Sequence, residues 1–265
     1  MKVAWCTDLH LDFVSSEYFT SLFERIRNES DALIISGDIG EAESTPAHLA
    51  NMVHVLGLKF PVYFVLGNHD YYKSSVVDVS YSIGSMLRGF PKMTWLTSAG
   101  VRQLLPGVGI LGQDGWYDGV FGNWNASTVR LPDYDCIQDL VGRPKPILLQ
   151  AIQALSKRFA ANAKRDLQIA VKKYATLLFV THVPPFRSAC THEGFPTDDK
   201  WLPHFSSAYM GAALTSVMAD NPDTELLVLC GHTHSYAWAD VLPNLRVLTG
   251  EAAYYAPDIC RIFDL

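Results

Sequence analysis

The sequence predicts an α/β (α+β) fold in which two mixed β-sheets pack as a two-layer sandwich flanked by α-helices. Five short apolar runs rich in Val, Ile, Leu and Phe each end abruptly in polar residues, which is typical of strands buried on both faces. Segments of helical period separate the early runs, and this alternation indicates βαβ units with a mainly parallel sheet. Short strands bounded by Gly and Pro occupy much of the later chain and predict hairpins or a second sheet.

The expected elements follow one another along the chain. The five apolar runs and the polar residues that end them occupy residues 3–11, 32–40, 62–70, 176–185 and 226–234. The spacing of apolar side chains such as Phe19, Phe23 and Ile26 predicts helices over 17–29 and 47–56. Shorter strands are expected at 93–96, 101–105, 108–111, 245–249 and 258–263. A loop insertion without periodicity is expected at about 112–145, and a helical tract at about 146–174.

Length and composition indicate a globular protein. The chain has 265 residues, of which 49% are hydrophobic and 18% charged, so we expect one elaborated domain over 1–265. A net charge of −6 gives no electrostatic reason to expect a long nucleic acid or an anionic membrane as partner.

The cysteines and the apolar runs indicate a compartment. The five cysteines are odd in number and form no CxxC pair, which argues against a disulfide framework and a thiolate zinc site. The first ten residues lack the apolar core of a signal peptide, and no apolar run approaches the roughly 20 residues that span a bilayer. A cytoplasmic protein is the expectation.

Each of the five apolar runs ends in residues that commonly bind metals. They are Asp8 and His10, then Asp38, then Asn68 with His69 and Asp70, then His182, and finally His232 and His234. The carboxyl ends of neighbouring parallel strands share one edge of a sheet, so we expect these residues to converge there. The i, i+2 spacing in the first and last runs would place both side chains on one side if the backbone is extended.

The donor set indicates the kind of metal. Two carboxylates, one amide and four imidazoles, with no thiolate among them, suit Mn, Fe, Zn or Co. Seven side chains are too many for one ion, and a carboxylate shared by two cations about 3.5–4 Å apart resolves the count. Each element alone has a simpler explanation, such as a capped turn or a hydrogen-bonded core histidine. Their joint occurrence predicts two divalent metal ions.

The ordered motifs DLH, GD, GNHD, TH and GHTH resemble those of the calcineurin-like metallophosphoesterase superfamily, from Asp8 to His234. The resemblance implies a β-sandwich flanked by helices with two metals at the strand ends. It implies one metal held by Asp8, His10 and His234, another held by Asn68, His182 and His232, and Asp38 as the bridge. It also implies that His69 lies beside the phosphate and protonates the leaving group, and that Asp70 orients His69 by accepting its other ring proton.

One motif departs from the family pattern. Many members have the motif GDxxD, and purple acid phosphatases have GDxxY with the tyrosine bound to iron. In this chain the motif reads GDIGE, and its last residue is Glu41. Without that tyrosine we do not expect a ferric-phenolate site. Whether Glu41 replaces the family aspartate stays open because its side chain is one methylene longer.

The expected reaction is hydrolysis of a phosphate mono- or diester by attack of a metal-bound hydroxide, by a phosphatase or a phosphodiesterase acting on a small substrate. The candidate walls of the substrate pocket are a loop with Trp116, Tyr117 and Trp124 and a later segment with Arg187, His192 and His204. The aromatic rings of the loop are candidates for stacking on the substrate, and Arg187 for binding a phosphate oxygen. The alternative is that these loops pack on the sheet. A catalytically inactive metal-binding scaffold is the competing function, and a metallo-oxygenase matches seven ligands less well.

Overall fold

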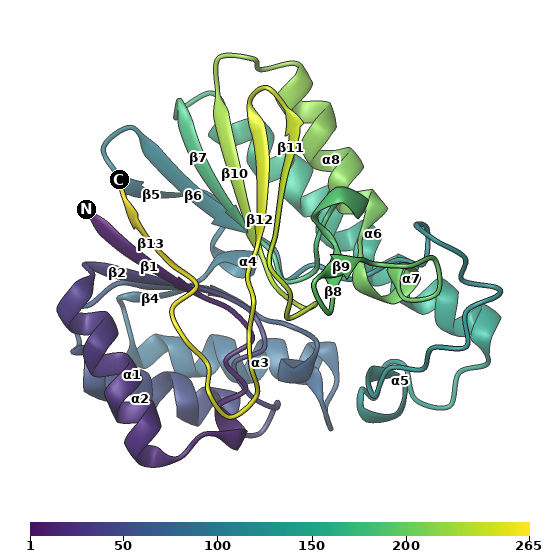
Figure 1. Cartoon of the computed structure of the whole chain (residues 1–265). Coiled ribbons are helices and arrows are strands. Elements are labelled where there is room, and N and C mark those ends of the chain that lie inside the picture. The colour runs from purple at the N-terminus through teal and green to yellow at the C-terminus, as the bar shows by residue number, and fades with distance from the viewer.

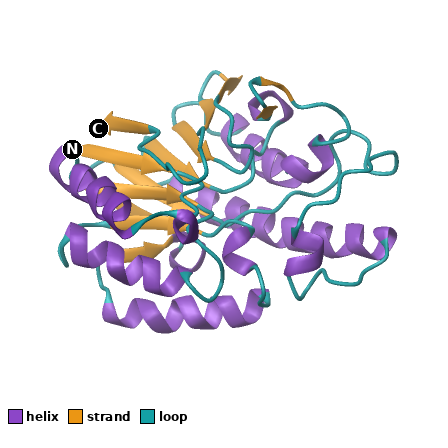
Figure 2. Ribbon diagram, turned by 60° about the horizontal axis from the view of Figure 1, so that its bottom comes forward, coloured by secondary structure: helices purple, strands orange, loops and turns teal.

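The computed structural model describes all 265 residues. It contains one sheet with strand order β13-β1-β2-β3-β4 and a second with order β11-β12-β10-β7-β6-β5. The strands of both sheets lie together and the helices gather around them (Figure 1, Figure 2). The predicted sandwich of two mixed sheets flanked by helices is therefore confirmed.

The first sheet is built from βαβ units. Its strands β1 (Lys2–Cys6), β2 (Ala32–Ser36), β3 (Val62–Val65) and β4 (Met93–Trp95) run parallel, and β13 (Arg261–Asp264) pairs antiparallel with β1. The connecting helices are α1 (Ser16–Glu29), α2 (Thr45–Leu56) and α3 (Val76–Met86). The segments at 93–96 and 258–263 thus complete this sheet and do not form separate hairpins, because β4 follows a crossover helix and β13 returns to the free edge of β1.

The second sheet combines parallel strands with two hairpins. β6 (Val108–Gly112), β7 (Thr176–Val180), β10 (Glu225–Cys230) and β12 (Leu245–Thr249) run parallel, while β5 (Arg102–Leu105) and β11 (Ala237–Leu242) pair antiparallel at its edges. The predicted helical tract is α6 (Lys145–Ala170), against which α8 (Ala208–Ala219) packs. The sequence analysis missed α8 because its residues are apolar nearly all round, which hides the helical period.

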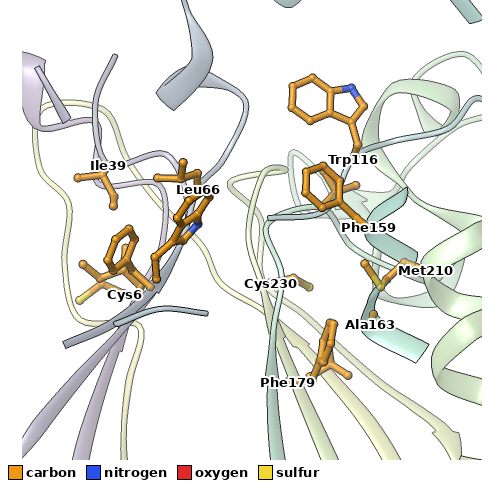
Figure 3. Packing of buried hydrophobic residues seen from close by; sticks show 14 of the residues in the cluster. Cys6, Ile39, Leu66, Trp116, Phe159, Ala163, Phe179, Met210 and Cys230 are labelled. Atoms are coloured by element: carbon orange, nitrogen blue, oxygen red, sulfur yellow. The ribbon is translucent and has the colours of Figure 1, made fainter. Parts of the chain in front are cut away.

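The strand side chains alternate between two cores. Val3 and Trp5 point into a layer shared with Ile34, Leu178 and Leu229, which come from both sheets, so this core lies between them. The intervening side chains face the helices in a larger core. Figure 3 shows part of that larger core, with Phe159, Ala163 and Met210 near Phe179 of the second sheet, and Cys6 and Ile39 on the side of the first sheet.

Short elements surround the carboxyl ends of the strands. They are the 3-10 turns Leu11–Phe13, His69–Tyr71 and Arg187–Ala189, the hairpin of β8 (Thr191–His192) and β9 (Phe195–Pro196), and the short helices α4 (Leu96–Ala99), α5 (Asp133–Cys136) and α7 (Leu202–Phe205). A further 3-10 turn, Leu87–Gly89, lies between α3 and β4 at the opposite ends of the strands. The long connection between β6 and α6, expected as a loop, contains only α5 as regular structure. None of the helices combines the length and the apolar character needed to cross a bilayer.

Candidate metal centre and active site

The candidate ligands follow strands of both sheets. Asp8 and His10 follow β1, Asp38 follows β2 and Asn68 follows β3, all in the first sheet. His182 follows β7, and His232 and His234 follow β10, in the second sheet. The expected convergence thus occurs where the carboxyl ends of two packed sheets meet, and not along the edge of a single sheet (Figure 1).

Four of these residues form one group of potential ligands. Asp8, His10, Asp38 and His234 each offer a ligand atom, and these atoms lie within 4.8 Å of one another. The Nε2 atoms of His10 and His234 are 3.1 Å apart, and Oδ1 of Asp8 lies 3.3 Å from Nε2 of His234. Carboxylates and imidazole nitrogens that converge from three strands fit a borderline divalent cation.

A second group adjoins the first through Asp38. Nε2 of His182 lies 3.0 Å from Oδ1 of Asn68 and 3.4 Å from Oδ1 of Asp38, and the ring centroids of His182 and His232 are 5.1 Å apart. The other oxygen of Asp38, Oδ2, lies 3.7 Å from Nε2 of His10. Asp38 therefore presents one carboxylate oxygen to each group of donors.

Backbone carbonyls fix which nitrogen of two histidines is free. Nδ1 of His182 donates to the Ser36 carbonyl at 2.9 Å, so Nε2 is the nitrogen directed at Asp38 and offered to a ligand. Nε2 of His232 donates to the His204 carbonyl at 3.0 Å, which leaves Nδ1 as its free nitrogen. Such contacts hold metal-binding imidazoles in one tautomer and one orientation.

The backbone at five candidate ligands is left-handed. Their φ angles lie between 42° and 71°, at Asp8, His10, Asp38, His232 and His234. Non-glycine residues rarely adopt this region, and such strain clusters at functional sites. The condition stated for the two i, i+2 pairs, an extended backbone, is therefore not met, because the chain turns sharply as soon as each strand ends.

Two glycines allow the carboxylates to approach the neighbouring chain. A Cβ atom on Gly67 would lie 2.1 Å from Oδ1 of Asp38, and one on Gly231 would lie 2.1 Å from Oδ2 of Asp8. Neither contact is possible for a residue with a side chain. The glycines that precede the Asn and His of GNHD and GHTH thus have a packing function at the site.

Attraction between opposite charges outweighs the cost of burying His182 and Asp38 in their charged forms. Burial opposes protonation of His182, yet the carboxylates of Asp38 and Asp8 outweigh it and raise the His182 pKa to about 10. Burial also opposes ionisation of Asp38, yet the imidazoles of His182 and His69 hold the pKa of Asp38 well below its usual range. Burial lowers the pKa of His10 to about 4. The carboxylates therefore favour a positive charge between them, which is the charge that a cation brings.

His69 lies at the open side of this cluster. Its backbone N–H donates to Oδ1 of Asp38 at 2.9 Å, and its Nε2 is 4.0 Å from Oδ2 of the same carboxylate. The ring packs edge-on against His10 and stacks on Tyr72, with centroid distances of 4.6 Å and 4.2 Å. Its side chain is 20% exposed and lines a pocket, so it is placed to meet a ligand.

Asp70 has a different position from the one expected. It is fully buried, and its carboxylate accepts hydrogen bonds from the backbone N–H groups of Ile39, Gly40 and Gly67 and from the hydroxyl of Thr45. None of these donors belongs to the His69 ring, because the 3-10 turn directs the two neighbouring side chains apart. The expected hydrogen bond from His69 to Asp70 is therefore wrong, and Asp70 instead ties the GNHD turn to the GDIGE turn.

A pocket of about 300 Å³ opens over the cluster. Besides Asp38 and Asn68 its lining includes His69, Tyr72, Asp133, His192, Phe205 and Tyr254. Tyr254 stacks on His10 with a centroid distance of 4.4 Å. The pocket thus has the candidate ligands at its base and mainly aromatic side chains on its walls.

Four residues expected to bind substrate lie elsewhere. Trp116, Tyr117 and Trp124 are 1%, 0% and 5% exposed and belong to the hydrophobic core, so they cannot stack on a ligand in the pocket. Tyr117 instead stacks on the ring of His232. Arg187 is exposed, pairs with Asp199 at 2.7 Å and does not line the pocket. Trp116 and Tyr117 are buried because removing their large apolar rings from water is favourable. This outcome corresponds to the alternative in which these loops pack on the sheet.

The surroundings of three further positions, Glu41, His204 and His192, were left open by the sequence. Glu41 pairs with Lys73 near the surface, so its carboxylate is not directed at the candidate metal ligands. His204 is buried, and its ring nitrogens are hydrogen-bonded to the hydroxyls of Ser127 and Tyr134. Its backbone carbonyl accepts a hydrogen bond from the candidate ligand His232. His192, by contrast, does line the pocket.

Asp133 contacts the site, and the sequence analysis did not single it out. Its Oδ1 accepts from the Asn68 amide at 3.0 Å and from the Tyr72 hydroxyl at 2.7 Å, and its Oδ2 accepts from the Tyr117 hydroxyl at 2.8 Å. The amide nitrogen of Asn68 is thereby held at Asp133, which turns its oxygen toward His182. Nothing in the surrounding sequence LPDYD distinguishes Asp133 from neighbouring aspartates as a residue of the site.

Two packed mixed sheets with carboxylate and imidazole donors at their strand ends place the protein in the class of metallophosphoesterase folds. The family model described as calcineurin-like phosphoesterase matches residues 1–236. The chain belongs to this family of phosphoester hydrolases, which use divalent metals, and the family resemblance noted in the sequence is confirmed.

Individual relatives are distant. The chain is 28% identical over 115 residues to UDP-2,3-diacylglucosamine hydrolases of Shewanella sp. (strain W3-18-1) and Shewanella putrefaciens, a match that covers 40% of this chain and 46% of theirs. The chain thus spans less than half the length of these curated relatives. Among solved structures, it is similar to a dimetal phosphatase from Danio rerio (TM-score 0.59, 14% identity, 95% of this chain and 87% of that one). It is also similar to the protein TT1561 of Thermus thermophilus (TM-score 0.52, 13% identity, 94% and 88%).

Proposed function

We propose that the protein is a binuclear metal-dependent phosphoesterase that hydrolyses a phosphate mono- or diester. The observation that carries the proposal is the position of Asp38, which offers Oδ2 to the donors around His10 and Oδ1 to those around His182. A carboxylate placed in this way can bridge two cations.

The donor chemistry fits two divalent ions of the Mn, Fe, Zn or Co type. Asp8, His10 and His234 would hold one ion, Asn68, His182 and His232 the other, and Asp38 both. When bound, the ions would lower the pKa of water so that hydroxide is available to attack phosphorus at neutral pH, and they would neutralise the phosphate oxygens. The chain itself fixes the tautomers of His182 and His232 through the carbonyls of Ser36 and His204.

His69 is the proposed general acid. Nε2 would donate its proton to the leaving-group oxygen, because the ring borders the pocket and its backbone is fixed on Asp38. Stacking on Tyr72 restricts the rotation of the ring. Asp70 supports this arrangement indirectly, since it holds the backbone of the GNHD turn.

The substrate is proposed to be a small phosphate ester. A pocket of about 300 Å³ is at the small end of ligand sites and suits a phosphate with a compact organic group. Tyr254, Phe205 and His192 offer ring surface to that group. The name of the Shewanella relatives adds a diacylated sugar nucleotide to the substrates to be tested. The choice between monoester and diester is left to the assay.

The test compares wild-type protein with His69→Ala after removal of metal and resupply of Mn. We expect wild type to hydrolyse p-nitrophenyl phosphate or bis-p-nitrophenyl phosphate. We expect His69→Ala to lose about 10²- to 10⁴-fold in kcat while it retains the same metal content. His54→Ala, which changes an exposed histidine on α2, is the matched control and should keep full activity. Equal inertness of wild type and His69→Ala with metal bound would instead support an inactive scaffold.

A further inference from the structure

A second cavity, of about 220 Å³, lies beside the pocket over the candidate ligands, which we call the metal pocket, and carries positive charge. It is formed by the connection between β6 and α6 together with the first turn of α6. Arg130, Arg143 and Lys145 line it, along with Trp124, Tyr134 and His204, and no carboxylate is among its lining residues. A lining with three cations and no acidic side chain is unusual in a chain of net charge −6.

Neutral groups hold two of the three cations in place. Nζ of Lys145 donates to the carbonyls of Asn125 at 3.1 Å and Ser127 at 2.7 Å, which leaves the third ammonium proton free. Nε of Arg143 donates to the carbonyl of Asp139, and neither Arg143 nor Lys145 pairs with a carboxylate. Carbonyl oxygens position these groups without neutralising them. Their full charge is therefore available to a ligand.

The other walls of the cavity are neutral. Arg130 is already paired with Asp135, so its charge is largely offset. Both ring nitrogens of His204 are engaged, Nδ1 with the Tyr134 hydroxyl and Nε2 with the Ser127 hydroxyl. Trp124 faces the Lys145 ammonium at 5.7 Å from its ring centroid and gives the cavity an aromatic side.

We propose that this cavity is an anion-binding site, separate from the metal centre, that takes the phosphate or carboxylate group of a small molecule. Arg143 would bind the anion through its free guanidinium N–H groups, and Lys145 through its remaining ammonium proton. The volume suits a phosphate with a few further atoms and excludes a polymer.

The site shares its wall with the metal pocket. Residues 131–133 line the metal pocket, whereas Arg130 and Tyr134 line the anion cavity. His204 also separates the two, since its ring lines the cavity and its carbonyl accepts from His232. An anion bound here would lie directly behind residues that orient candidate ligands of the second ion.

The experiment follows the Trp124 indole N–H resonance of ¹⁵N-labelled, Zn-loaded protein, assigned by comparison with Trp124→Phe. Inorganic phosphate and acetate are titrated separately and test the two classes of anion. We expect at least one of them to shift this resonance saturably, and the double variant Arg143→Ala/Lys145→Ala to raise the apparent dissociation constant at least tenfold. Lys172→Ala/Lys173→Ala removes the same charge from an exposed pair beyond the end of α6 and should leave the titration unchanged.

Two further arms make the result decisive. Asp38→Asn should retain the Trp124 shift, which shows that the signal does not come from phosphate at the metal centre. Arg143→Ala alone tests the same site if loss of the Lys145 contacts unfolds the loop. The proposal is overturned if neither anion shifts the resonance, if the shift disappears in Asp38→Asn, or if both charge-deletion pairs titrate like wild type. Each of these outcomes leaves the phosphoesterase proposal untouched, since that depends on His69 and the metals.

Discussion

Replacing Asp133 by alanine should weaken the binding of one metal ion selectively. Asp133 does not belong to the proposed ligand set, yet its carboxylate holds the nitrogen end of the Asn68 amide at 3.0 Å. Without this acceptor the amide can rotate, and its oxygen no longer faces His182 at 3.0 Å. The ion proposed at Asn68, His182 and His232 should lose affinity, whereas the ion at Asp8, His10 and His234 should not.

The magnitude follows from the contacts that are lost. Outer partners of metal ligands typically contribute about 10- to 100-fold in affinity, which corresponds to about 1.4–2.7 kcal/mol. The Tyr72 and Tyr117 hydroxyls also lose their acceptor, at about 1–3 kcal/mol for each donor that water does not reach. The variant should therefore be less stable as well. Asp133→Asn, which keeps one oxygen for Asn68, should retain most of the affinity.

The assay is calorimetric titration of Mn into EDTA-stripped protein, with metal content measured in parallel. Asp135→Ala is the control, because this exposed aspartate two residues along pairs only with Arg130. The decisive comparison is a double-mutant cycle with Asn68→Ala. If Asp133 acts through Asn68, its substitution should have little further effect in the Asn68→Ala background. An equal loss of affinity in both backgrounds, or none in either, would refute the reasoning.

Three other substitutions or conditions test the geometry. Gly67→Ala should abolish binding of both ions, since its Cβ would lie 2.1 Å from Oδ1 of Asp38. The control is Gly84→Ala in α3, where nothing lies within 4 Å of the added Cβ. This variant should bind metal normally and gain about 0.5–1 kcal/mol of stability. Asp70→Ala should lower the urea-unfolding free energy of EDTA-treated protein by at least about 2 kcal/mol, because buried donors lose their acceptor; no change would indicate that Asp70 serves only the bound site. Saturation with Mn at about 100 times its dissociation constant should raise the unfolding free energy by about 2.7 kcal/mol, and an unchanged thermal midpoint would contradict the metal sites.

The strands and the residues at their ends could be predicted because both leave a local trace. A strand buried on two faces reads as a continuous apolar run, and the chain becomes polar where it leaves the sheet. That rule located Asp38 after β2 and His182 after β7 without reference to their separation in the sequence. It could not indicate that the two residues follow different sheets, since a run of apolar letters carries no information about its partners.

The contacts made by loops left no such trace. Trp116 and Tyr117 stand in a stretch rich in Gly and Asp, where composition suggests exposure, but the loop folds back so that both rings complete the core. Asp70 could equally orient a neighbouring ring or accept from backbone N–H groups, and only the direction of the 3-10 turn decides between them. Asp133 is one aspartate among several in its loop until Asn68 is seen to contact it.

The division of the donors between two sheets gives the core between them a role beyond stability. Asp8, Asp38 and Asn68 are fixed to the first sheet, while His182, which approaches Asp38 to 3.4 Å, is fixed to the second. Their separation is therefore set by how closely the sheets pack, through side chains such as Trp5 and Leu229 in the shared layer. Dense packing tolerates little movement, so this layer holds the donors of the two sheets at the spacing that the proposed bridging carboxylate requires. The apolar runs that identify the fold thus also determine the geometry of the proposed metal centre.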